Sequence, residues 1–101
     1  MAKEQNTNLS QSYSIEDFVA VCAALAEEVR VKMILLLLDQ KMCVSEISES
    51  LNISIANASH HLIILKRVKI LMSKKQGKEN YYQIDPNGYR CVKKMILETL
   101  F

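Results

Sequence analysis

Hydrogen-bonding and cationic side chains are concentrated between residues 54 and 67 of this chain, with no acid among them. The set comprises Ser54, Asn57, Ser59, His60, His61, Lys66 and Arg67. Hydroxyl, amide, imidazole and ammonium groups bond to phosphate oxygens and to the edges of nucleic-acid bases. The simpler alternative is that these residues cap and solvate an ordinary helix. Contact with nucleic acid is the chemistry that these residue types favour.

Three more lysines, Lys74, Lys75 and Lys78, lie in a polar segment whose one acid is Glu79. Residues 66–78 hold six of the thirteen Lys and Arg and no acid, whereas residues 16–49 hold seven acids and three bases. The formal net charge is only +2, so the whole chain is not a polycation. A domain with one basic end still suits a phosphate backbone. We therefore predict phosphate contacts for the three lysines, the alternative being a plain solvated loop.

Motifs for catalysis or metal binding are few. The chain has no Gly-rich phosphate loop and no His-x-x-x-His or Cys-x-x-Cys spacing, so we predict that it is not an enzyme. On a helix, His60 and His61 would point about 100° apart, which does not suit one shared metal ion. The three cysteines are an odd number in no metal-finger spacing, which favours free thiols in a reducing cytoplasm.

Size and hydropathy predict one domain without a membrane segment. The chain has 101 residues, half of them hydrophobic, and few Gly and Pro, which favours a mostly helical core. The apolar run Met33–Leu38 is too short to cross a bilayer, and Asp39-Gln40-Lys41 follows it. The N-terminus lacks the features of a secretory signal. We expect a cytoplasmic protein with no membrane partner.

Two short helices are predicted to hold the polar set of residues 54–67. The first runs from Ser45 to Leu51, and Asn52-Ile53 interrupts its pattern. The second covers about residues 54–67, with Ser54 as its N-cap. The apolar positions that define their buried faces are Val44, Ile47 and Leu51, then Ala58, Leu62 and Leu65. Two helices joined by about four residues are typical of a helix-turn-helix.

A β-hairpin is predicted directly after this motif. Ile70–Ser73 and Tyr81–Ile84 change to strand periodicity, and the polar segment Lys74–Asn80, with Gly77, connects them as a loop. Met42-Cys43-Val44 is predicted to be a short extended entry to the motif. A hairpin in this position is a wing, so the lysines would lie on the wing.

The remaining segments are predicted to frame this motif. Residues 1–13 are polar and aperiodic and are predicted to form a flexible tail, followed by a folded domain over 14–101. Helices are expected from Ser14, which pairs with Asp17 as a cap, over Val29–Leu38, and from Asp85-Pro86. The apolar positions of the first and last helices are Phe18, Val21, Cys22 and Leu25, then Tyr89, Val92, Met95, Ile96 and Leu100. We expect these two helices to pair across a two-fold axis, because so small a domain leaves apolar surface uncovered.

Over roughly residues 18–97 the sequence resembles the ArsR/SmtB winged-helix repressors. The segments that carry the resemblance are Ala24-Leu25-Ala26 through Arg30, Cys43–Ile47, Ser59–Leu62 with Leu65-Lys66, and Gln76–Lys78 before Tyr81-Tyr82. Residues 55–62 are most similar to the cadmium/lead-sensing branch. The resemblance implies a homodimeric transcriptional repressor that an inducer releases from operator DNA. Two recognition helices would then enter successive major grooves, about 34–36 Å apart.

The metal sites of that family are incomplete here. Soft-metal sensors of the family carry Cys-Val-Cys where this chain has Cys43-Val44-Ser45, and residues 1–13 contain no Cys. A soft divalent cation such as Cd²⁺ needs several thiolates, so Cys43 is a weak candidate ligand, and we favour its interpretation as a small buried hydrophobe. In the family's second site Asp85 and Glu98 match, whereas Asn87 and Phe101 do not. Neither site is intact.

Two alternatives to metal sensing follow from the resemblance. Some family members sense oxidants or reactive sulfur through paired thiols, so Cys22 and Cys91 could form a redox switch, although burial on an apolar face would make Cys22 inert. A repressor without an effector is the other variant. From a different class, the winged helix could be a protein-interaction module that no longer touches DNA.

Overall fold

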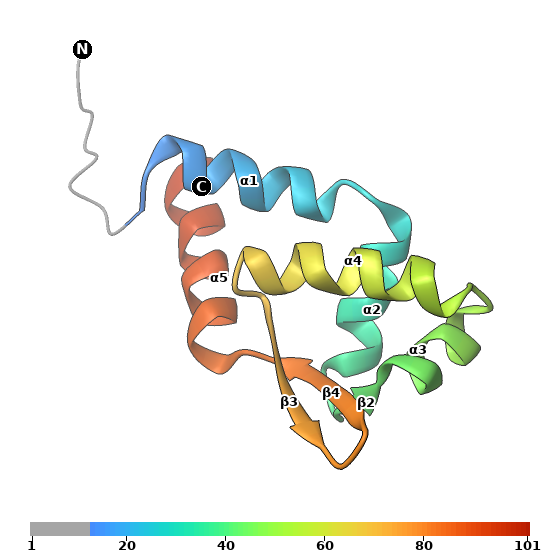
Figure 1. Ribbon diagram of the computed structural model, residues 1–101. Helices are drawn as coiled ribbons and strands as arrows, with labels where there is room; N and C mark the ends of the chain where they lie inside the picture. Colours follow the sequence, from blue (N-terminus) through green and yellow to red (C-terminus); the bar gives the residue numbers. More distant parts are fainter. Residues whose placement is uncertain (1–12) are drawn as a thin grey trace.

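The computed structural model describes residues 13–101, in which five helices and three short strands are present (Figure 1). In chain order they are α1 (Ile15–Leu25), α2 (Glu28–Leu37), β2 (Met42–Cys43), α3 (Val44–Leu51), α4 (Ile55–Arg67), β3 (Leu71–Gln76), β4 (Glu79–Ile84) and α5 (Pro86–Leu100). The predicted fold class, mainly helical with a hairpin after a helix-turn-helix, is confirmed. The predicted tail lies outside the described residues except for Tyr13.

The core is built around α4, which packs against α2, α3 and β3. Ala58, Leu62 and Leu65 are completely buried, so the predicted inner stripe of this helix is confirmed. The largest fully buried side chains around it come from the neighbouring elements and are Met33, Leu37, Ile47, Ile70 and Leu71. Because α4 is anchored along one side by these contacts, its opposite side is held in a fixed orientation toward solvent.

Capping residues start three of the helices at the positions that the sequence predicted. The Ser14 Oγ accepts from the Asp17 N–H at 3.0 Å, and the Ser14 N–H is 3.4 Å from the Asp17 carboxylate, which forms the predicted capping box of α1. Ser54 caps α4 in the same way, because its Oγ accepts from the Asn57 N–H at 3.0 Å. Asp85 caps α5 ahead of Pro86. These predicted helix starts are confirmed.

A left-handed residue makes the turn between α3 and α4. Asn52 has φ of 56°, and the Ile53 N–H donates to the Ser48 carbonyl at 3.0 Å, which closes the end of α3. The chain then passes directly to the Ser54 cap. The Asn52-Ile53 interruption in the apolar pattern is therefore the turn of the helix-turn-helix.

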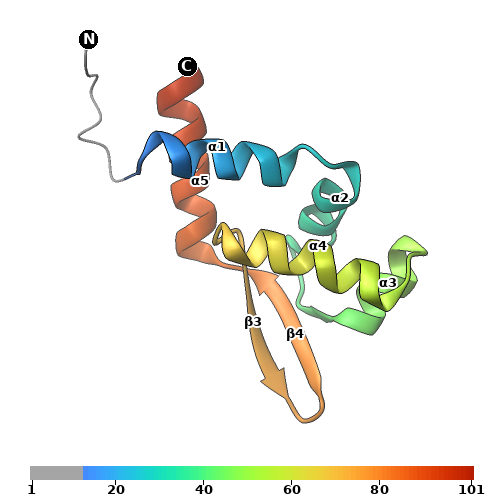
Figure 2. The ribbon, with the colours of Figure 1, turned by 45° about the horizontal axis from the view of Figure 1, so that its top comes forward.

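The wing is a three-stranded antiparallel sheet in the order β2-β4-β3, and its hairpin projects away from the helices (Figures 1 and 2). The predicted loop Lys74–Asn80 is wrong, because β3 and β4 continue to Gln76 and Glu79, which are paired. Gly77 has φ of 64°, and a glycine at the first of two turn residues allows so tight a connection. Lys74 and Lys75 are therefore strand residues. Val44 likewise begins α3 instead of extending β2.

The apolar face predicted for α1 is confirmed in part. Val21 is buried and Phe18 and Leu25 are half-buried, whereas Cys22, which was predicted on this face, is exposed in the protomer. Ala24 is the second buried residue of this helix, and Cys22 is exposed together with Ile15 and Val19. Among the helices of residues 13–101, none is both long and apolar enough to span a bilayer.

Candidate nucleic-acid interface

The outer face of α4 is an exposed surface without acids. Ser59 is half-buried, and His60 at the next position is exposed. The other exposed residues of this helix are Ile55, Ala56, Asn57, Ile63, Lys66 and Arg67. A rigid helix that offers hydroxyl, amide, imidazole and cationic groups outward has the form of a groove-reading element.

The N-terminus of α4 differs from those of the three helices before it. α1, α2 and α3 each carry an acid in the first turn, and α4 carries none. The partial positive charge of its N-terminal N–H groups is therefore not offset locally. Only the neutral Ser54 hydroxyl caps this end. Such an end attracts a phosphate group.

The wing adds cations beside α4. Lys74, Lys75 and Lys78 are all exposed, and neighbouring strand residues such as Lys74 and Lys75 point to opposite faces. Lys66 Nζ donates to the Ser73 Oγ at 2.8 Å, which joins the last turn of α4 to the start of the wing. The structure thus connects the end of α4 to the strand that carries Lys74 and Lys75.

His61 is partly buried, next to His60, and lies against a buried arginine. Arg30 is 8% exposed, and its Nε and Nη2 donate to the carbonyls of Ala24 at 2.6 Å and Ala23 at 3.3 Å. Its Nη1 lies 3.0 Å from the His61 Nδ1. Because arginine can only donate, the His61 Nδ1 is the acceptor and its proton sits on Nε2. Arg30 therefore connects the end of α1 to the middle of α4.

This contact makes stability depend on pH. Burial lowers the pKa of His61 from its ordinary value of 6.5, and the charges of Arg30 and His60 lower it further, against a smaller opposing effect of Glu27. Below pH 6.5 the unfolded chain therefore binds more protons than the folded one, so stability falls as pH falls. Between pH 7.5 and 5.5 we expect the urea midpoint of a His61→Gln variant to fall less than that of the parent protein, because the variant lacks the contribution of His61.

A matched variant is available at the neighbouring position. His60→Gln removes an exposed imidazole and should keep the pH dependence of the parent protein. If the urea midpoint changed equally with pH in the parent and in His61→Gln, the assignment of this pH dependence to His61 would be contradicted.

Cys43 has no set of metal ligands around it. Its Sγ is buried and lies 3.2 Å from the Ser45 Oγ, and the nearby Glu46 carboxylate accepts from the Cys43 N–H at 3.0 Å to cap α3. One thiol, one hydroxyl and an occupied carboxylate do not fit a soft-metal site. Within residues 13–101, no three His, Cys, Asp or Glu side chains gather as a metal cluster would require.

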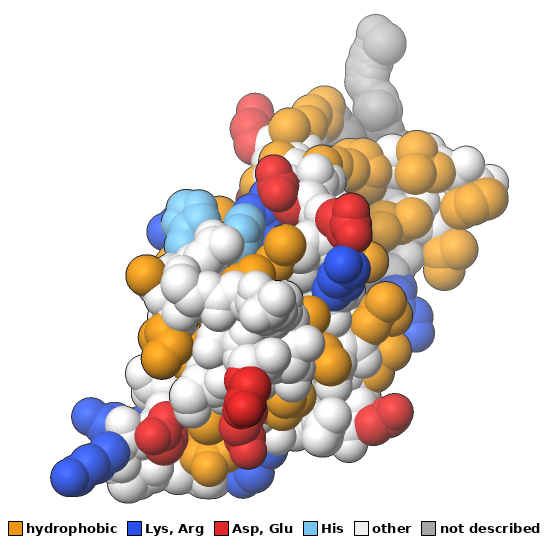
Figure 3. Space-filling model, turned by 90° about the vertical axis from the view of Figure 1, so that its right-hand side faces the viewer, with side chains coloured by type: hydrophobic (Ala, Val, Ile, Leu, Met, Phe, Trp, Pro, Cys, Tyr) orange, Lys and Arg blue, Asp and Glu red, His pale blue; other side chains and the backbone are white. Residues whose placement is uncertain are grey.

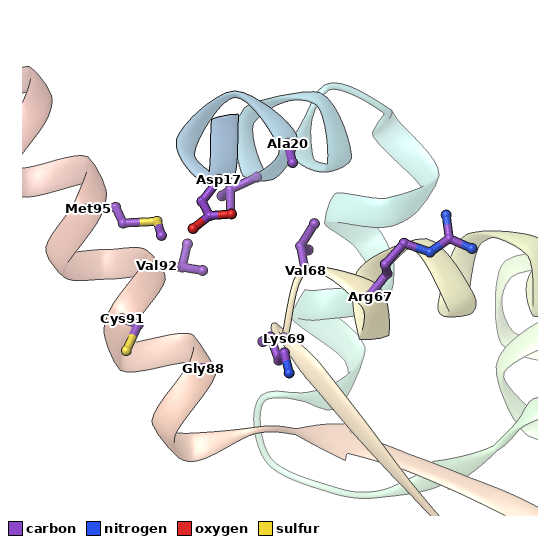
Figure 4. Close-up of a pocket in the computed structure, with 10 residues that line it drawn as sticks. Asp17, Ala20, Arg67, Val68, Lys69, Gly88, Cys91, Val92 and Met95 are labelled. Carbon is purple, nitrogen blue, oxygen red and sulfur yellow. The ribbon is translucent and has the colours of Figure 1, made fainter. Parts of the chain in front are cut away.

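Cys91 lines a hollow of about 350 Å³ between α1, α5 and the corner that links α4 to β3 (Figure 4). Asp17 is directed into the space between α1 and α5, near Val92 and Met95. Cys22 is not among the residues that line this hollow, although both thiols are exposed. The two cysteines thus do not share this hollow.

Three residues of this region escaped sequence reasoning. Arg30 shares the buried stripe of Met33, Ile34 and Leu37 at helical spacing, a pattern that could have marked it as buried. Ala58 and Leu62 define the buried side of this helix, so the sequence could have predicted that Ile63 is on the exposed side. No local pattern marks Gly88, which matters because the backbone carbonyl of Lys69 leaves no room for a side chain at this position.

Together the capped recognition helix and the adjoining lysine-bearing hairpin define a winged helix-turn-helix protein. Residues 27–71 match the family model described as bacterial regulatory protein, arsR family. This segment, which contains the helix-turn-helix, is thus similar to the ArsR family of bacterial regulators.

Two bacterial regulatory proteins are similar in sequence over about two thirds or more of this chain. A cadmium resistance transcriptional regulatory protein homologue of Staphylococcus aureus is 39% identical over 70 residues, 68% of this chain and 58% of the relative. The arsenical resistance operon repressor of Escherichia coli is 34% identical over 76 residues, 74% of this chain and 65% of that one. The chain thus spans less than two thirds of the length of these relatives.

Solved structures support the fold. A homodimeric winged helix-turn-helix DNA-binding domain from Mycobacterium bovis superposes with a TM-score of 0.72 at 23% identity, covering 100% of this chain and 94% of that one. An ArsR-like transcriptional regulator from Rhodococcus gives 0.72 at 22% identity, covering 82% of this chain and 78% of that one. At these identities the similarity concerns the fold alone.

Proposed function

We propose that this protein is a sequence-specific, DNA-binding transcriptional repressor. The observation that carries the proposal is the acid-free outer face of α4 beside a wing that bears three exposed lysines. The residues assigned to DNA contact are Ser54, Asn57, Ser59, His60, Lys66, Lys74, Lys75 and Lys78. His61 supports α4 through Arg30, which makes it a positioning residue. Catalysis has no part in the proposal, and a location in the cytoplasm agrees with it.

The proposed function is tested by selecting duplexes from a random library with the purified protein. Enrichment of a two-fold-related sequence, followed by fluorescence anisotropy that shows tighter binding than to scrambled duplex, supports the repressor. Failure to enrich any duplex at low salt would favour the alternative, a protein-interaction module on a winged-helix scaffold.

A two-fold dimer through α1 and α5 is part of the proposal. Apolar side chains remain exposed on both helices of the protomer, among them Val19 at 58% and Leu97 at 57%. Phe101 at the end of α5 is 94% exposed. Apolar surface of this kind on two neighbouring helices fits burial against a second copy. A dimer would also present two α4 helices to successive major grooves.

Charges placed on this surface should separate the protomers. The double variant Val19→Asp, Leu97→Asp would bury two uncompensated carboxylates per protomer in the interface, so we expect monomers at micromolar concentration. Sedimentation velocity measures this directly. Leu38→Asp, at a 46% exposed position of the α2 end, is the matched control and should remain dimeric. A double variant that stays dimeric would place the interface elsewhere.

For the inducer we propose a signal other than a soft metal held at Cys43, because the donors there do not fit one. Titration with Cd²⁺ or Zn²⁺ should therefore change the affinity for a selected duplex less than about twofold. Release of DNA on oxidation, abolished by Cys91→Ser or Cys22→Ser, would support thiol sensing. Release by stoichiometric Cd²⁺ that Cys43→Ser abolishes would contradict the proposal.

A further inference from the structure

The outer face of α4 carries exposed apolar side chains in addition to its polar groups. Ile55, the first residue of the helix, is 57% exposed, and Ile63 is 47% exposed. Ile55, Ser59 and Ile63 follow one another at intervals of four residues, so they form one ridge along the helix. Ala56, exposed beside Ile55, extends the apolar area at the N-terminal end.

The surroundings of these side chains show what kind of partner they fit. α4 has no acid, its last turn holds Lys66 and Arg67, and the wing lysines lie beyond. Figure 3 shows hydrophobic side chains along one edge of the molecule, between the two histidines and the cations at the far corner. An apolar strip beside cations matches a polyanion that carries apolar groups. In the major groove of duplex DNA, that group is the C5-methyl of thymine.

We infer that Ile55 and Ile63 read thymine methyl groups and so determine operator specificity, an inference that rests on the proposed DNA-binding function. Eight residues separate the two isoleucines, which is about 12 Å along the helix and about three to four base-pair steps. Each half-site should therefore hold two separated thymines. Ser59 and His60 lie between the isoleucines and supply the hydrogen bonds to the bases there.

The test uses a duplex selected with the purified protein, in which each thymine is replaced in turn by deoxyuridine. This change removes the methyl group and keeps every phosphate and hydrogen-bonding group. At two positions of each half-site we expect affinity to fall about fourfold per methyl, as anisotropy measures it. Ile55→Ala should abolish the thymine-to-uridine difference at one of these positions, and Ile63→Ala at the other.

Leu38→Ala is the matched control, because Leu38 is a 46% exposed apolar residue at the C-cap of α2. It should keep both thymine-to-uridine differences. Uridine duplexes that bind as tightly as thymine duplexes would overturn the inference while DNA binding stands. Differences that persist unchanged in both isoleucine variants would overturn it as well. If no duplex is enriched at all, the proposed function fails together with the inference.

Discussion

Replacing Lys74, Lys75 and Lys78 together by alanine is expected to weaken binding to a selected duplex by at least about a hundredfold at 0.15 M salt. Each phosphate that a lysine neutralises adds about 0.9 to the slope of log affinity against log salt. A dimer loses six wing lysines in this variant, so the slope should fall by up to about 5. Anisotropy titrations between 50 and 300 mM salt measure both effects, because salt screens the attraction between lysines and phosphates more strongly as its concentration rises.

A control of equal charge separates contact from net charge. Lys32, Lys93 and Lys94 lie on α2 and α5, away from the wing, and their triple alanine variant removes the same number of cations. This control variant should lose much less affinity for the duplex and keep most of the slope of log affinity against log salt. Equal losses in the two triple variants would mean that the wing acts only through overall charge and touches no phosphate.

The elements that present the proposed DNA-binding surface could be predicted from the sequence because their signals are local. The Ser54 side chain and the Asn57 backbone are three residues apart, so the cap of α4 depends on no distant group. The buried stripe Ala58, Leu62, Leu65 repeats at helical spacing, which places the opposite face outward without further information. The same is true of the Asp85-Pro86 start of α5.

The features that the sequence did not predict depend on groups far away along the chain. Cys22 was expected on the apolar face of α1, but Val21 and Ala24 are the residues of this helix that face the core of the protomer. Arg30 is buried because two carbonyls of α1 and an imidazole of α4 meet at its guanidinium. The polar residues next to Gly77 were expected in a loop because strand propensity is low there, yet the turn conformation at Gly77 keeps the strands paired to their tips.

Gly88→Ala is expected to destabilise the protein by about 3 kcal/mol, a large effect for the addition of one methyl group. A Cβ at this position would overlap the carbonyl oxygen of Lys69 and lie 2.9 Å from the Lys69 side chain. The obstacle is backbone, and Lys69 is itself held at φ of 69° between α4 and β3. Relief would require α5 to move away from the corner that joins the recognition helix to the wing.

The sign of this effect distinguishes packing from helix propensity. Gly88 lies in α5, where propensity alone would make alanine more stable than glycine by about 1 kcal/mol. Gly77→Ala is the matched control, because Gly77 has open space around it and only its φ of 64° opposes a side chain, so about 1 kcal/mol should be lost. Urea unfolding at one protein concentration compares the variants, since a dimer's apparent stability depends on concentration. A Gly88→Ala protein as stable as the parent would mean that α5 is free to shift against the α4–β3 corner.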